Sequence, residues 1–433
     1  MRLTNHRARA VLALLPLLAA AACKDETPTL SGDEFFPGGS RPVTLEAVIP
    51  ASQFLQTNGV FTGYESSHTF GEQVVANQYQ GVLSAHALQR YDFPDTLTFS
   101  QDGTSRNDTL YGVRSARLVI TVDTLGSLLT GSTTVQAFEL AQPYDFVTTT
   151  WERAVDNDSV HTPWTQPGGT TGPLLGQGTY THAAGDSVVI ALDSAAAARI
   201  RPGSFPGVLL AVNNGRRLQL SGSVLRLRTR PSNAVRDTTI ALDVNASQAT
   251  FVFTPQPPTP AGSWLAGGVN AARTLFEVDL DQPVPGCAPP ATCAPLRLKD
   301  VNLNRVSLLL KPLPPPPGFD PLQPLTLTVW TVDEPELGRR APLGHLALDG
   351  TVVNGQLVNQ FVNQAPADTV VELPITLTTL DAIQRDTLQL SFALLGQTPP
   401  VSGFSSRSFG MVRYDPLPRL RVVYTLPTRP QLP

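Results

Sequence analysis

Aromatic side chains give this sequence its clearest capacity to hold a ligand. Trp151 and Trp164 lie in one polar stretch, and Tyr144 precedes them. An aromatic ring offers a flat apolar face with a polar group at its edge, and a sugar ring can stack on such a surface. The alternative is that these rings fill a core or fasten a loop, because a buried Trp removes about 150–250 Å² from water. We name Trp151, Trp164 and Tyr144 as candidate ligand-binding residues.

Oxygen-bearing side chains follow in the run Asp156-Asn157-Asp158-Ser159. Alternating carboxylate, amide and hydroxyl groups are ligands that Ca²⁺ accepts. The run lacks the Gly and the distal Glu of an EF-hand loop, so a solvated turn is the favoured interpretation. The histidines are scattered and form no His-Glu-x-x-His motif. We therefore predict no metal site and no cofactor.

Catalytic motifs are missing from the sequence. There is no Gly-x-Ser-x-Gly nucleophile elbow and no Gly-rich phosphate loop followed by Lys. Two carboxylates from different strands could still converge in space, as they do in glycosidases. We predict no catalytic residue and a protein that is not an enzyme, with an envelope hydrolase as an alternative.

Cysteines occur three times, and two of them flank a short Ala-Pro-Pro-Ala-Thr loop. An exported protein meets an oxidising compartment, so Cys287 and Cys293 are predicted to form a disulfide. The alternative is a metal or redox pair, but no further Cys or His ligand lies nearby in the sequence.

The third cysteine, Cys23, belongs to an N-terminal export signal. Arg2, Arg7 and Arg9 are followed by an apolar stretch over 11–22, which is too short for the roughly 20 residues that span a bilayer. This arrangement is typical of a secretory signal peptide. With small residues before Cys23, it resembles the signal of bacterial lipoproteins, in which that cysteine is lipidated. The alternative is an ordinary cleavage site with an incidental cysteine.

The residues after Cys23 bear on location. Lys24 at the second mature position resembles lipoproteins sent to an outer membrane, and Lys24-Asp25-Glu26 is similar to signals for export to the cell surface. We predict a signal peptide over 1–22 and a lipidated, Pro/Gly-containing tether over 23–41. The expected partner is thus a membrane, and the expected location is the cell envelope, periplasmic or surface-exposed.

Composition limits the remaining classes. The chain has 433 residues, a net charge of −4 and 15% charged residues, and it shows no concentrated basic stripe, so nucleic acid is an unsuitable partner. Hydrophobic residues reach 41%, which excludes a disordered chain. Forty prolines and few charges favour an all-β extracytoplasmic protein with many turns.

A strand pattern recurs along the chain. The β-branched stretch 113–122 returns as 301–310, with Arg305 in the place of Arg117. Three further stretches match in the same order: 81–93 with 268–280, 186–189 with 368–371, and 225–227 with 420–422. This spacing is far longer than the roughly 20–50 residues of solenoid repeats, so a duplicated domain is favoured. The alternative is chance, because strand sequences resemble one another.

Domain boundaries follow from this repeat. We predict two tandem jelly-roll-like antiparallel β-sandwiches over 42–231 and 238–428, with a short linker between them. No alternation of strands and helices indicates a parallel sheet.

The first half resembles the DNRLRE-type domains of secreted bacterial proteins, which are jelly rolls related to carbohydrate-binding modules. The matching segments are 118–122, 135–138, Trp151-Glu152, Trp164 and 225–227. The resemblance covers 88–229 and, more faintly, 274–425. It implies a non-catalytic lipoprotein that binds a glycan or matrix polymer. An adhesion or accessory lipoprotein that binds another envelope protein is the alternative.

Overall fold

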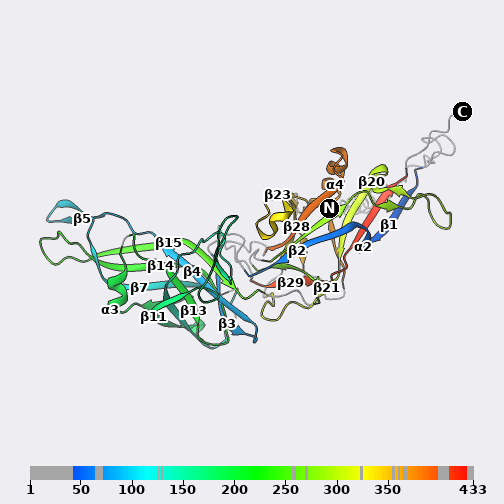
Figure 1. The fold of residues 1–433 in the computed structure, drawn as a ribbon. Helices are drawn as coiled ribbons and strands as arrows, with labels where there is room; N and C mark the ends of the chain where they lie inside the picture. Colours follow the sequence, from blue (N-terminus) through cyan, green and yellow to red (C-terminus); the bar gives the residue numbers. More distant parts are fainter. Residues whose placement is uncertain are drawn as a thin grey trace, which may run out of the picture.

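The computed structural model describes residues 42–63, 72–124, 126–127, 130–201, 203–255, 260–268, 272–321, 325–353, 356–358, 361–363, 369–397 and 409–426. Over these ranges the chain is all-β, and antiparallel sheets pack as sandwiches. The predicted fold class is confirmed. Two lobes lie side by side along one long axis (Figure 1).

Lobe one is built on one folded sheet, in the order β11-β8-β13-β4-β15-β14-β7-β12, with β3 beside β14 and β4. A Cβ at Gly176 or Gly178 would collide with a β12 carbonyl oxygen, so these glycines let β11 lie close against β12. The elements are β3 (Gln73–Tyr79), β4 (Leu83–Tyr91), β5 (Leu97–Gln101), β6 (Thr104–Asp108), β7 (Gly112–Asp123), β8 (Ser132–Leu140), β9 (Arg153–Asp156), β10 (His161–Pro163), β11 (Thr171–Thr181), η1 (His182–Ala184), β12 (Ser187–Ala191), α3 (Ser194–Arg199), β13 (Val208–Val212), β14 (Arg217–Arg230) and β15 (Ile240–Phe253).

Lobe two has two main sheets, ordered β1-β30-β20-β27 and β2-β17-β28-β22-β23. A small sheet of β16, β29 and β21 lies on the side of lobe one. The elements are β1 (Thr44–Pro50), α2 (Ala51–Phe54), β2 (Leu55–Phe61), β16 (Trp264–Gly267), β17 (Arg273–Asp279), β18 (Pro283–Val284), β19 (Leu296–Arg297), η2 (Leu298–Asp300), β20 (Asn302–Leu310), β21 (Pro312–Leu313), β22 (Leu325–Val332), η3 (Pro335–Arg340), β23 (Leu343–Leu346), β24 (Thr351–Val353), β25 (Gln356–Val358), β26 (Phe361–Asn363), β27 (Val371–Pro374), α4 (Thr376–Gln384), β28 (Gln389–Gln397), β29 (Met411–Tyr414) and β30 (Arg419–Thr425).

The recurring strand pattern forms β7 in lobe one and β20 in lobe two. In β7 every second residue from Ala116 to Val122 is buried, while Arg117 and Thr121 are exposed. This alternation gives one face to the core and one to water. β7 pairs with β14 and β12, and β20 pairs with β30 and β27. The matched stretches of the sequence therefore occupy corresponding strands.

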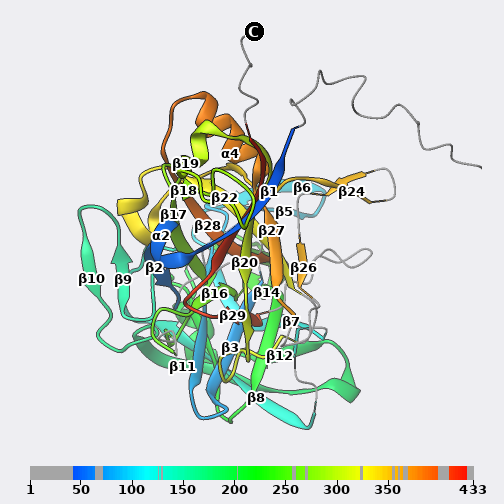
Figure 2. The ribbon, with the colours of Figure 1, turned by 90° about the vertical axis from the view of Figure 1, so that its right-hand side faces the viewer.

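The N-terminal segment corrects the predicted domain boundary at residue 42. β1 and β2 precede lobe one in the sequence, yet β1 pairs with β30 and β2 pairs with β17, both in lobe two. Figure 2 shows the blue β1 running beside the red β30. The alternating pattern of 44–49 predicts a strand, but a local pattern does not specify its partner.

The predicted start of the second domain at residue 238 is also corrected. β15, which begins two residues later, pairs with β14 and β4 of lobe one. The proline-containing segment after Arg230 is thus a turn within lobe one. The chain passes between the lobes at two other places, near Gly63 and after Phe253, where the Phe253 N–H donates to the Gly63 oxygen over 3.3 Å.

An aromatic core joins the lobes. Phe251 and Phe253 of β15 pack with Phe319 and Phe409 of lobe two, and the rings of Phe253 and Phe409 lie 5.2 Å apart. Arg217 is buried beside them and donates to the Gly318 oxygen over 2.9 Å. Burial lowers the pKa of Arg217. A buried apolar contact of this kind restricts relative motion of the two lobes.

Candidate functional site

The predicted aromatic residues lie in a long loop, residues 141–170, that crosses the outer face of the lobe-one sheet. Trp164 is only 5% exposed, and Tyr144 and Trp151 are half-buried. With Leu88 and Leu209 of the sheet beneath, they form one apolar cluster. The Trp164 indole N–H donates to the Thr150 oxygen over 2.9 Å, so the ring fastens the loop to itself as well.

Trp151 is fixed by its neighbours on both sides. Gly168 has φ +84°, and a Cβ there would collide with the Trp151 ring. His86 lies 5.3 Å from that ring, and its Nδ1 is 2.8 Å from the Gly168 oxygen. Burial lowers the pKa of His86, which favours a neutral ring whose Nδ1–H donates to the carbonyl.

These contacts give Trp151, Trp164 and Tyr144 a packing role, and the ligand-binding role stays a prediction. A ring that stacks on a sugar needs an open face, whereas these rings pack a loop onto a sheet. The interpretation that they fasten a loop, which the sequence left open, matches the geometry.

The acidic run at Asp156 pairs with arginine side chains of the protein. Asp156 accepts hydrogen bonds from Arg153, His161 and Arg339, the last from lobe two. Burial alone would raise the pKa of Asp156, but these donors outweigh it and lower the pKa to about 2. Asp158 pairs with Arg340. Among the described residues no group of three His, Cys, Asp or Glu gathers as a metal site.

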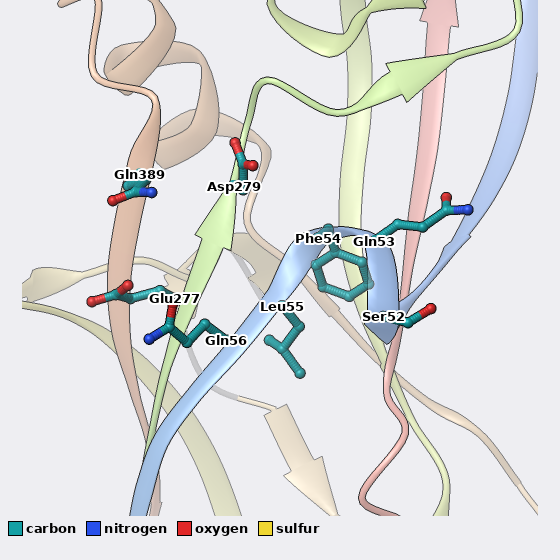
Figure 3. Close-up of a pocket in the computed structure, with 8 residues that line it drawn as sticks. All are labelled: Ser52, Gln53, Phe54, Leu55, Gln56, Glu277, Asp279 and Gln389. Carbon is teal, nitrogen blue, oxygen red and sulfur yellow. The ribbon is translucent and has the colours of Figure 1, made fainter.

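Lobe two carries a polar groove that the sequence analysis did not single out. One hollow of about 180 Å³ lies on β2, β17 and β28, and a larger one of about 900 Å³ shares Gln56 and Glu277 with it and reaches η3. Figure 3 shows the smaller hollow. The polar residues lining it are Ser52, Gln53, Gln56, Glu277, Asp279 and Gln389.

The carboxylate of Glu277 in this polar groove is held in place by hydrogen bonds. It sits opposite Gln56 on one side and Ser391 on the other. Asn58 donates to its Oε1 over 2.8 Å, and the Ser391 hydroxyl donates to the same oxygen over 3.3 Å. Among the described residues none donates to the second carboxylate oxygen, which can accept from a ligand. Exposed amides such as Gln56 and Gln389 offer donors and acceptors beside it.

The residues lining the smaller hollow present a row of hydrogen-bonding groups on three adjacent strands. Two of them, Glu277 and Asp279, are carboxylates, which can accept hydrogen bonds and can also take part in acid–base chemistry. The signal in the sequence was the alternation Phe276-Glu277-Val278-Asp279, which places two carboxylates on one face of a strand.

The remaining predicted residues fall in two places. Cys287 and Cys293 form a disulfide, as predicted, with Cα atoms 5.7 Å apart. Cys23, the predicted lipidation site, lies outside the described residues. No described helix has the length and apolar character needed to cross a bilayer.

Comparisons with known proteins give little for this chain. No family model matches it, and no curated protein matches it. One solved structure, a candidate secreted protein from Parabacteroides distasonis, is similar over 87% of this chain and 99% of its own, at 10% identity and a TM-score of 0.21. That score is too low to support an inference about fold or function.

Proposed function

We propose that this chain is a non-catalytic, lipid-anchored protein of the cell envelope that binds a glycan through the polar groove of lobe two. The N-terminal signal supports the anchor, since a basic start, a short apolar stretch and Cys23 match the order found in bacterial lipoproteins. Several acyl chains contribute about 0.8 kcal/mol per buried methylene, which suffices for stable attachment.

The fold bears on how such an anchor would present the protein. β1 begins at Thr44, opposite Thr425, at the end of lobe two that lies farthest from lobe one (Figure 1). A tether of some 20 residues has a root-mean-square reach of roughly 25 Å. Lobe two would therefore stand next to the membrane, and the β5–β6 hairpin of lobe one would point away from it.

The observation that carries the ligand assignment is the hydrogen-bonding surface around Glu277. Sugar hydroxyls both donate and accept, and a carboxylate held by Asn58 with amides beside it meets both needs. The face is open because the segment 333–342, which includes η3, covers Leu275 and Ala393 but leaves the polar groove uncovered.

A glycan array probed with the purified full chain tests this assignment. We expect binding to fall with Glu277→Ala, because the variant removes the acceptor that the groove holds in place. The matched control is Glu139→Ala, which removes a carboxylate paired with Arg199 on lobe one and should leave binding unchanged. Equal binding by all three chains, or no glycan signal at all, would refute the glycan assignment and favour a protein partner.

Attachment is tested separately. Labelling of cells with a palmitate analogue should mark the wild-type chain, and Cys23→Ser should abolish the label and release the protein into the soluble fraction. Retention of the Cys23→Ser chain in membranes would contradict lipid anchoring. Protease treatment of intact cells distinguishes a surface position, where the chain is digested, from the periplasmic leaflet, where it is protected.

A further inference from the structure

The two lobes share one topology, element by element. The order β15-β14-β7-β12 in lobe one corresponds to β1-β30-β20-β27 in lobe two. The order β11-β8-β13-β4-β15 corresponds to β23-β22-β28-β17-β2. The short helices α3 and α4 also correspond. α3 follows β12, which pairs with β7, and α4 follows β27, which pairs with β20.

One element has a different origin in the two lobes. In lobe one the strand between β4 and β14, at which the partner changes, is β15, and it follows β14 directly along the chain. In lobe two the same place is taken by β1, α2 and β2, which come from the N-terminus. Among the described residues between 260 and 426, none takes this place.

A shared sequence marks the correspondence. Ala51-Ser52-Gln53 forms the turn of α2 at which the segment passes from one sheet to the other. Ala246-Ser247-Gln248 lies at the register shift of β15, where that strand changes its partner from β14 to β4. The same three residues thus stand at the same bend in both lobes.

The N-terminal segment is held as an edge strand of both lobe-two sheets. Leu45, Ile49 and Phe54 are buried in the lobe-two core, and Phe54 is 1% exposed. Main-chain pairing runs from Thr44 to Pro50 with β30 and from Leu55 to Phe61 with β17. These contacts depend on the sequence of the segment and not on any covalent link to lobe two.

We propose that lobe two contains an acceptor site for an extended strand, that residues 42–63 are its ligand, and that a second copy of this chain can supply it. An exchanged segment makes every contact that it makes within its own chain, so such an exchange costs little free energy. The segment lies at the edge of both lobe-two sheets, so its exchange leaves the pairing among the other strands unchanged. The proposal is independent of the glycan assignment.

Cysteine cross-linking between full chains tests the exchange. Thr44 and Thr425 are register partners whose hydroxyl oxygens lie 3.3 Å apart. One preparation carries Thr44→Cys and a differently tagged one carries Thr425→Cys, both in a Cys23→Ala background. The two are mixed, warmed to the onset of unfolding, cooled and oxidised. We expect a disulfide-linked heterodimer.

The control pair is Thr98→Cys with Asn107→Cys, register partners in the β5–β6 hairpin, which has no segment to exchange. This pair should give no heterodimer above the level of chance collision. The double variant Thr44→Cys/Thr425→Cys should close within one chain. Closure in the double variant without heterodimer in the mixture refutes the exchange. Failure of the double variant to close refutes the acceptor site itself, and heterodimer no greater than in the control pair refutes the proposal as well.

Discussion

The outer faces of the two corresponding sheets are covered differently. In lobe one, residues 141–170 cover the face with Trp164, Trp151 and Tyr144. In lobe two, the shorter segment 333–342 covers only part of it and leaves the polar groove open. One framework thus carries a closed face and an open one, and the length and apolar content of a single connection decide between them.

The largest effect is expected when Phe54, the most buried large side chain of the N-terminal segment 42–63, is truncated. Phe54→Ala leaves a cavity in the lobe-two core and should destabilise that lobe by about 3–5 kcal/mol. Hydrogen exchange should show lost protection in β30 and β17, while β7 and β14 keep theirs. Val48→Ala, at an exposed position of β1 in the same N-terminal segment, is the control. Equal loss in both lobes would mean that they unfold as one unit.

A smaller effect is expected from opening the closed face. Trp164→Ala removes a buried ring and its hydrogen bond to Thr150, at a cost of about 3 kcal/mol or less, because the loop can collapse. Proteolysis should then cut within 141–170, and glycan binding by lobe two should not change. If binding falls, the aromatic loop contributes to the ligand site after all.

The weakest effect concerns the ion pair between Asp156 and Arg339, which ties the covering loop of lobe one to η3. The pKa of Asp156 is lowered to about 2 in the folded chain. Its contribution, on the order of 1 kcal/mol after solvent screening, is therefore complete above the unfolded value near pH 4 and is lost as the pH falls through about 2. Urea titrations between pH 5 and pH 2 should show this loss in the wild type but not in Asp156→Asn. Parallel curves would exclude the ion pair as a source of stability.

The sequence predicted secondary structure better than it predicted partners. The alternation in β7 and β20 was enough to place both strands, and the spacing of Cys287 and Cys293 was enough to place the disulfide. The pattern of residues 44–49 predicted a strand equally well. Its pairing with β30 could not be read from that pattern, because the choice depends on a core assembled from residues hundreds of positions away.

The candidate site was missed for a related reason. A Trp residue suggests ligand binding in a sequence, but its role depends on whether the ring is exposed to a ligand or buried under a loop. The sequence does not show how the loop 141–170 packs on the sheet. Glu277 gives a weak signal by itself. It gains meaning only because β2 and β28 bring Asn58 and Ser391 to the same carboxylate oxygen.

The course of the N-terminal segment has a mechanical consequence. β1 starts at the far end of lobe two, and β2 runs on toward lobe one (Figure 1). Tension between the N-terminus and lobe one would pass along the covalent chain of this segment, and lobe two would lie beside that path, bound through β30 and β17. A force applied at the tether would therefore reach lobe one without first pulling lobe two apart.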